Sequence, residues 1–165
     1  MLQVSDVEIE NRLRFDNPWW VAGAGIEPDH ASLPRRAYLG SFLRLVRQAE
    51  VNRAVVLLGP RRVGKTVLVY HSIQALLDEG ASGRDIVYVS LETPIFTGLT
   101  LDGLVKRFRG LFGHPTNTRL YVFFDEVQYL HDWQVHLKSL VDDHRDCRFV
   151  ATGSASAALR TQSAE

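Results

Sequence analysis

The sequence predicts an α/β fold built on a mainly parallel sheet, and three observations support this expectation. Short apolar runs alternate with helix-length amphipathic stretches, the pattern of repeated strand–helix–strand units with right-handed crossovers. The first apolar run, residues 54–58, leads through a glycine-containing turn into a helix-length stretch. The chain has 165 residues, which is long enough for one domain with a substantial core. We therefore expect a three-layer sandwich, with helices on both faces of the sheet.

The expected elements follow one another in a regular order. Apolar runs typical of buried strands lie at residues 54–58, 86–91, 120–124 and 148–151. Apolar residues recur every three or four positions, as in helices, at residues 38–50, 67–79, 101–112 and 133–144. Gly113 is placed to end the third of these helices, and Asp132 is placed to cap the fourth.

The first fifty residues carry no catalytic pattern, so we expect a lead-in segment with one helix at residues 1–50 and the core at residues 51–165. Trp19 and Trp20 stand beside Pro18 in this lead-in segment. We expect both indoles to pack on the domain, since aromatic side chains are mostly core material. The alternative is that they stack on a base or on a partner.

Composition excludes several function classes. Lys plus Arg and Asp plus Glu both number 19, so the formal net charge is zero, which argues against a strongly basic nucleic-acid module. The single cysteine, Cys147, cannot form an internal disulfide and suits a reducing compartment. The acidic N-terminus lacks the apolar stretch of a signal peptide, and no apolar run approaches the ~18 residues of a membrane span. We expect a cytoplasmic protein that does not enter a membrane.

The turn after the first strand matches the phosphate-binding pattern G-x-x-x-x-G-K-[ST] at every fixed position. Its glycines allow several backbone N–H groups to surround one point, and the following helix adds its N-terminal N–H groups and dipole. Lys65 is expected to reach the β- and γ-phosphates of a nucleotide, and the Thr66 hydroxyl to bind Mg²⁺. Arg61 and Arg62 either lie near phosphate or are solvated. The expected nucleotide-binding residues are Gly59, Pro60, Arg61, Arg62, Val63, Gly64, Lys65, Thr66 and Val67.

Two further segments are expected at the same sheet edge, because ligands in parallel α/β sheets bind at the carboxyl ends of the strands. Asp125 follows the third strand and can hold Mg²⁺, while the adjacent Glu126 can activate a water that attacks the γ-phosphate. Thr152 and Ser154 end the fourth strand, where a hydroxyl could contact the γ-phosphate or the water, or simply form a turn. Glu92 either holds Glu126 in an inactive orientation through Thr93 or water, or is a solvated strand-end charge.

With these motifs in place, the chain resembles a known family. Residues 12–20, Arg-Leu-Arg-Phe-Asp-Asn-Pro-Trp-Trp, precede the phosphate loop, and the segments 124–128, 132–133 and 152–154 follow it in order. This arrangement is similar to AAA+-type ATP-binding proteins that usually continue into a C-terminal nuclease-like domain. The resemblance implies Walker-A roles for Lys65 and Thr66, and Walker-B roles for Asp125 and Glu126. It also implies a sensor role for Thr152 or Ser154.

The sequence departs from this family at its end. The family's sheet has a fifth strand next to the first, and a Gly-Arg pair follows the sensor, whereas this sequence ends at Glu165 with neither. We therefore expect part of a longer protein, with Arg160 a doubtful arginine finger and the fifth core strand lacking.

The resemblance implies an ATPase domain of the additional-strand catalytic-glutamate class, with ATP and Mg²⁺ as ligands. The implied partners are ATP or ADP, a second copy of the domain and a C-terminal domain, with DNA left open. The alternatives are a slowly hydrolysing nucleotide switch and an ATPase that regulates a DNA-handling protein. A small-molecule kinase is a weaker alternative, because the Asp-Glu pair is present and no lid is evident.

Overall fold

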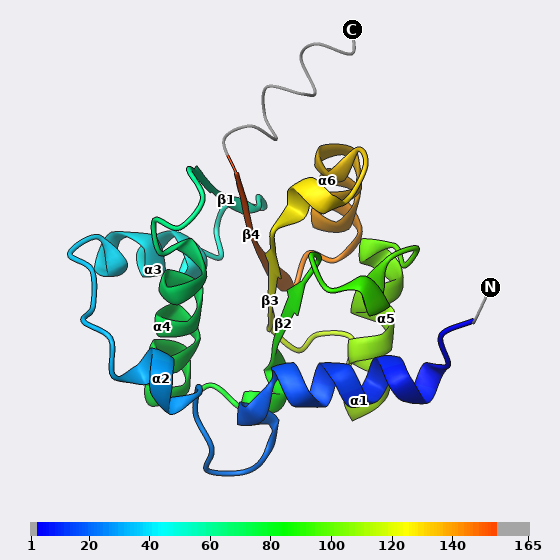
Figure 1. The fold of residues 1–165 in the computed structure, drawn as a ribbon, viewed down its shortest axis with the longest axis horizontal. Helices are drawn as coiled ribbons and strands as arrows, with labels where there is room; N and C mark the ends of the chain where they lie inside the picture. The colour runs from blue at the N-terminus through cyan, green and yellow to red at the C-terminus, as the bar shows by residue number, and fades with distance from the viewer. Residues whose placement is uncertain (1–2, 155–165) are drawn as a thin grey trace, which may run out of the picture.

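A computed structural model describes residues 3–154 of the chain. Its sheet contains β1 (Val55–Gly59), β2 (Ile86–Ser90), β3 (Leu120–Asp125) and β4 (Cys147–Ser154). The strand order is β1-β4-β3-β2 and every pair is parallel (Figure 1). The expected parallel α/β sheet is confirmed. β4 lies between β1 and β3. The expectations about a missing fifth strand and about Arg160 concern the sequence beyond residue 154, outside the described residues.

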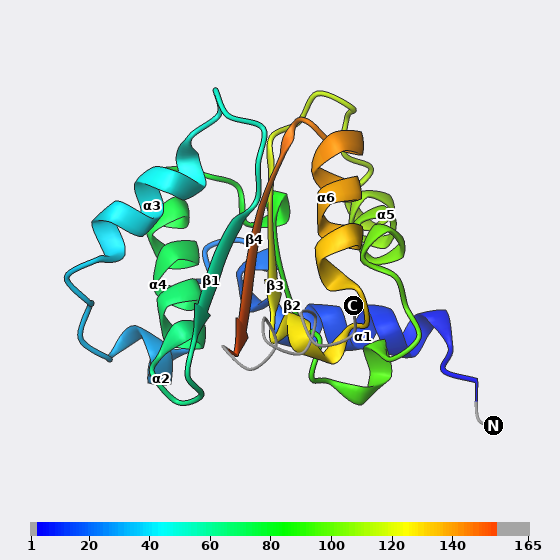
Figure 2. The same cartoon turned by 90° about the horizontal axis from the view of Figure 1, so that it is seen from above.

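Helices cover both faces of this sheet, so the three-layer arrangement is confirmed. On one side lie α3 (Leu39–Arg47) and α4 (Lys65–Asp78), and on the other lie α5 (Leu101–Phe112) and α6 (Trp133–Asp143) (Figure 2). Gly113 ends α5 with φ 58°, as expected. Asp132 occupies the position before α6, but its side chain does not cap the helix and instead approaches His131.

The core is densest around the two central strands. The side chains of Phe123, Phe124 and Phe149 are at most 2% exposed, as expected for strands covered on both faces. β1 differs, because Val56 and Leu58 are each 41% exposed. The expectation that the first strand is buried is therefore wrong for every second residue. Within the described residues, β1 is an edge strand that pairs only with β4.

The expectation of a single helix in residues 1–50 is also wrong. Besides α3, the segment contains α1 (Asp6–Asp16), a 3-10 helix at Pro18–Trp20 and the short α2 (Pro28–Ala31). The Ser5 hydroxyl caps α1 by accepting from the Glu8 N–H at 3.3 Å, while Glu8 Oε2 accepts from the Ser5 N–H at 2.8 Å. This reciprocal capping box fixes where α1 begins.

The segment after α1 covers the free edge of β2. The Asn17 amide donates to Tyr88 O at 3.0 Å and accepts from Tyr88 N–H at 2.6 Å. The indoles of Trp19 and Trp20 both donate to Ile86 O, at 3.1 and 2.7 Å. Both tryptophans are at most 5% exposed, so the expectation that they pack on the domain is confirmed. These side chains satisfy backbone groups that an edge strand would otherwise leave open to another chain.

The end of the lead-in segment is attached to β4 by one buried cation. Arg148 is only 4% exposed, and its guanidinium donates to Val46 O at 3.1 Å and to Val51 O at 3.0 Å. Carbonyl oxygens near a helix C-terminus carry partial negative charge, which suits a guanidinium. Residues 3–50 are therefore bonded both to the edge strand β2 and to β4.

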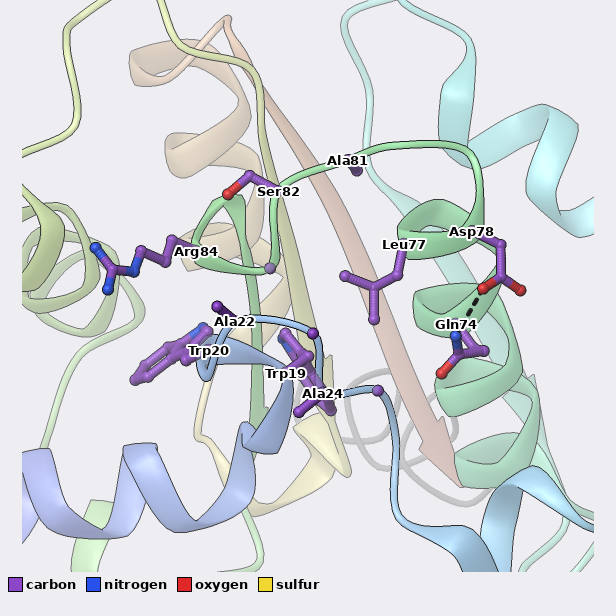
Figure 3. Close-up of a pocket in the computed structure, with 13 residues that line it drawn as sticks. Trp19, Trp20, Ala22, Ala24, Gln74, Leu77, Asp78, Ala81, Ser82 and Arg84 are labelled. Atoms are coloured by element: carbon purple, nitrogen blue, oxygen red, sulfur yellow. Dashed lines mark hydrogen bonds between the residues drawn. The ribbon is translucent and has the colours of Figure 1, made fainter.

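A cavity of about 390 Å³ lies between the lead-in segment and the C-terminal half of α4. Figure 3 shows Trp19 and Trp20 on one side of it, and Leu77 and Gln74 on the other. Gln74 donates to Asp78 at 2.8 Å. The cavity is at the opposite end of α4 from residues 59–66, so it is separate from the expected phosphate loop. No helix within residues 3–154 combines the length and the apolar character that a membrane crossing requires.

Asn17→Ala is expected to destabilise the fold by about 2–3 kcal/mol, because the buried N–H and C=O of Tyr88 lose their partners. Urea denaturation followed by circular dichroism measures this free energy of unfolding. Asn117→Ala, at an exposed turn residue of the same type, is the control and should change it by less than about 0.5 kcal/mol. Equal effects of the two substitutions would contradict the edge-covering role of Asn17.

Candidate functional site

The segment from Gly59 to Thr66 forms a tight loop between β1 and α4. Gly64 precedes α4 with φ 89°, and Arg62 has φ 63°, so the loop needs left-handed backbone at two positions. Lys65 is 8% exposed, and its ammonium donates to Gly59 O at 2.9 Å and Pro60 O at 2.5 Å. The loop thus curls around its own lysine, in the strand–loop–helix setting that the sequence predicts.

The loop has the features of an anion site. α4 has 14 residues, and among the described residues no side chain caps its N-terminus, which leaves the N–H groups of the first turn available to an anion. A Cβ atom on Gly64 would lie 2.6 Å from a guanidinium nitrogen of Arg36. The lead-in segment therefore brings a second cation to the loop beside Lys65. Val63 is 39% exposed on the outside of the loop.

Asp125 connects three elements at the carboxyl edge of the sheet. It is 2% exposed, and its Oδ2 accepts from Thr66 Oγ1 at 2.8 Å and from Tyr88 Oη at 2.6 Å. Its Oδ1 accepts from Thr152 Oγ1. A buried carboxylate is costly unless hydrogen bonds replace its water, and these three hydroxyls supply them.

Tyr88 is held in its neutral, donating form. Burial, followed by the negative charge of Asp125, raises the pKa of Tyr88 far above the usual tyrosine range. The ring of Tyr70 packs against it with centroids 4.8 Å apart, and burial likewise raises the pKa of Tyr70. Tyr88 therefore keeps its proton at neutral pH and donates it to Asp125.

Glu126 follows Asp125 in a left-handed backbone conformation, with φ 59° and ψ 50°. Such a conformation costs a residue other than glycine about 1–3 kcal/mol and is typical of functional sites. The Glu126 N–H donates to Thr152 Oγ1 at 3.2 Å, and its carboxylate accepts from the side chain of Gln128. The backbone and the carboxylate of Glu126 are thus each held by one polar group.

The remaining predicted residues surround this centre. Ser154 is 5% exposed at the end of β4, and its N–H donates to Gln128 Oε1 at 3.2 Å. Arg61 donates to the Tyr129 hydroxyl at 3.3 Å, and this hydrogen bond, followed by the more distant charges of Glu126 and Glu92, raises the pKa of Arg61. Val67 lies half-buried in the first turn of α4.

The donor set at the centre fits Mg²⁺ rather than a softer metal. The Thr66 hydroxyl and the Asp125 carboxylate already lie 2.8 Å apart, and Mg²⁺ prefers oxygen donors together with phosphate and water. Among residues 3–154, no three His, Cys, Asp or Glu side chains are grouped as an all-protein metal centre would need. The chain's own residues therefore fit a metal that arrives with a phosphate ligand.

Three residues of this site were missed by the sequence analysis: Tyr88, Gln128 and Arg36. Tyr88 and Gln128 contact Asp125 and Glu126 through side chains, and Arg36 approaches the loop from the lead-in segment. For Gln128 a signal was present, because it lies two residues after the Asp125-Glu126 pair in the sequence. For the other two, the contacts depend on how distant segments pack.

The fold and the loop define this chain as an α/β protein of the phosphate-loop class. A family model described as an AAA domain (AAA_14) matches residues 51–165. The chain belongs to this AAA domain family. A search of curated protein sequences finds no match for it.

One solved structure supports this assignment of fold, and two others show a lower similarity. The replication initiator DnaA bound to AMPPCP and single-stranded DNA matches with a TM-score of 0.50 at 14% identity, over 78% of this chain and 42% of that chain. PCH-2 from C. elegans matches with a TM-score of 0.46 at 19% identity, over 74% and 39% of the two chains. AMPPCP-bound DnaA from Aquifex aeolicus gives 0.47 at 15% identity, over 78% and 43%. The chain thus spans less than half the length of each of these proteins.

Tyr88→Phe is expected to flatten the loss of stability above about pH 10. The pKa of Tyr88 is higher in the folded protein than in the unfolded chain, where it is about 10. The contribution of Tyr88 to the free energy of unfolding is therefore fully present below about pH 10. Above that pH the unfolded chain loses the proton first, so stability falls by up to about 1.4 kcal/mol per pH unit.

Urea midpoints of wild type and Tyr88→Phe between pH 8 and 11 measure the difference. Tyr38→Phe, at an exposed tyrosine, is the control and should retain the wild-type slope. Parallel curves for wild type and Tyr88→Phe would contradict the assignment.

Proposed function

We propose that this domain binds ATP with Mg²⁺ at Gly59–Thr66 and hydrolyses it, with Glu126 as the group that activates water. The observation that carries the proposal is the contact between the loop and the strand edge, where Thr66 of the loop donates to Asp125 at 2.8 Å. Because Glu126 follows Asp125 directly, the phosphate loop and a second carboxylate share this edge. Membership of an AAA domain family supports nucleotide binding.

Each residue has a defined task in this proposal. The backbone N–H groups of the loop and the Lys65 ammonium would bind the phosphates, and would stabilise the negative charge that develops on them. Thr66 and Asp125 would hold Mg²⁺, which when bound neutralises charge on the β- and γ-phosphates. Glu126 would accept a proton from the attacking water, while Thr152 or Ser154 would sense the γ-phosphate from the end of β4.

We also propose that the nucleotide state is passed to a partner or a further domain. The resemblance to proteins with a C-terminal nuclease-like domain supports a following domain, and self-association through the ATPase domain is a second route. One solved neighbour, DnaA, is bound to single-stranded DNA as well as AMPPCP. The rate of ATP hydrolysis with and without single-stranded DNA separates a DNA-coupled role from a slow switch, since a flat response would count against DNA.

Lys65→Ala is expected to weaken ATP binding by about 10- to 100-fold, because a charge-assisted contact to phosphate is worth about 1.5–3 kcal/mol. Titration of the protein with a fluorescent ATP analogue in the presence of Mg²⁺ gives the dissociation constant. Lys138→Ala, which removes an exposed lysine on α6, is the control. An unchanged dissociation constant for Lys65→Ala would refute the loop assignment.

Glu126→Gln is expected to lower kcat for ATP hydrolysis by about 10²- to 10⁴-fold while ATP binding stays within about twofold of wild type. The amide keeps the shape of the side chain but cannot take the proton from water. Phosphate release measures kcat, and the ATP titration measures binding. Glu50→Gln at an exposed position is the control; full turnover by Glu126→Gln would remove Glu126 from the catalytic role.

A further inference from the structure

Gln128 joins the ends of the two central strands through both halves of its side-chain amide. Its Nε2 donates to Glu126 Oε2, at the end of β3. Its Oε1 accepts from the Ser154 N–H at 3.2 Å, at the end of β4. One side chain therefore spans from the proposed catalytic carboxylate to the proposed sensor strand.

The backbone around Gln128 fixes the position of this amide. Gln128 lies in the 3-10 helix Val127–Tyr129, whose first residue is fully buried and accepts from the Leu130 N–H at 2.9 Å. Opposite it, β4 has glycine at position 153. A Cβ atom there would lie 3.2 Å from Val127 Cγ2 and 3.4 Å from Gln128 Oε1. The absence of a side chain at Gly153 is what allows this turn to pack so closely against β4.

The hydrogen bond from Gln128 makes the two oxygens of the Glu126 carboxylate different from each other. Oε2 receives the amide of Gln128, whereas in the described part of the chain Oε1 receives no hydrogen bond. A carboxylate held at one oxygen loses rotational freedom and presents the other oxygen in one direction, which is the requirement for a general base acting on a positioned water.

We propose that Gln128 is a positioning residue for hydrolysis: it fixes Glu126 relative to the end of β4 so that Oε1 faces the attacking water. The proposal rests on the catalytic role proposed for Glu126. Nε2 of Gln128 sets the orientation of the Glu126 carboxylate. Oε1 of Gln128 accepts from the Ser154 N–H and so holds the Gln128 side chain against β4. From the sequence, Glu92 was left either as a group that holds Glu126 in an inactive orientation or as a solvated charge; the side chain in contact with Glu126 is Gln128.

The first test uses substitutions that separate the two halves of the amide. Gln128→Glu keeps an acceptor for the Ser154 N–H but removes the donor to Glu126, and Gln128→Ala removes both. Both variants are expected to lower kcat by about 10- to 100-fold while KM and the ATP dissociation constant stay within about twofold. Gln48→Ala, at the half-buried C-cap residue of α3, should retain wild-type kcat.

The same substitutions in the Glu126→Gln background show whether Gln128 acts through Glu126. If it does, Gln128→Ala should cause no further loss of kcat there, since residues that act as one unit are not additive. A further 10-fold loss in that background, or wild-type or higher kcat for Gln128→Glu, would overturn the proposal.

A second test does not depend on turnover. Gln128→Glu places two carboxylates in contact and is expected to lower the Tm by on the order of 3 °C. In the exchanged pair Glu126→Gln with Gln128→Glu, an amide again faces a carboxylate, so the Tm should recover most of this loss. Absence of recovery would overturn the contact, and with it the proposal. Absence of wild-type ATP turnover would instead count against the proposed function, and this melting series would still decide whether Gln128 holds Glu126.

Discussion

The buried carboxylate of Asp125 is the interaction on which the rest of the site depends. It is 2% exposed and accepts from Thr66, Tyr88 and Thr152, which belong to α4, β2 and β4. An uncompensated charge at this depth would cost several kcal/mol, so the three hydroxyls must arrive together. They do so because the parallel register sets Ser90 beside Asp125, and sets Phe124 beside Ala151, one residue before Asp125 and Thr152. The strand pairing that builds the sheet is therefore also what assembles the site.

The lead-in segment is part of the same structure. Asn17 bonds the backbone of Tyr88 on the outer edge of β2, while the Tyr88 hydroxyl bonds Asp125 on the inside. Tyr88 thus links the end of α1 to the site, because its backbone is bonded to Asn17 and its hydroxyl is bonded to Asp125. At the other side of the sheet, Arg148 fastens the end of α3 to β4, and Arg36 between α2 and α3 approaches the loop. Residues before position 51 therefore contribute to the geometry of the loop as well as to the edge of the sheet.

Sequence patterns predict the parts of this molecule that depend on neighbouring residues. The loop, the order of strands and helices, and the placement of Asp125 and Glu126 follow from local spacing. α1 was missed because only Ile9 and Leu13 are buried on an otherwise polar helix, although Ser5 and Glu8 form a recognisable capping box. Tyr88 was missed because its contact with Asp125 depends on register and packing between segments, whereas Gln128 had a local signal in its position two residues after Glu126. The exposure of Val56 depends on which strands flank β1, and that information is not local either.

The left-handed backbone of Glu126 has a consequence for how the protein balances stability against chemistry. Glycine adopts φ near 59° without the steric penalty of a side chain, so a glycine at position 126 would relieve about 1 kcal/mol of local strain while removing the carboxylate. Glycine, the residue with the least backbone strain in this turn, thus has no carboxylate that could act on water. A glutamate at position 126 therefore carries this strain in the folded state, a cost that the water-activating role proposed for its carboxylate would explain.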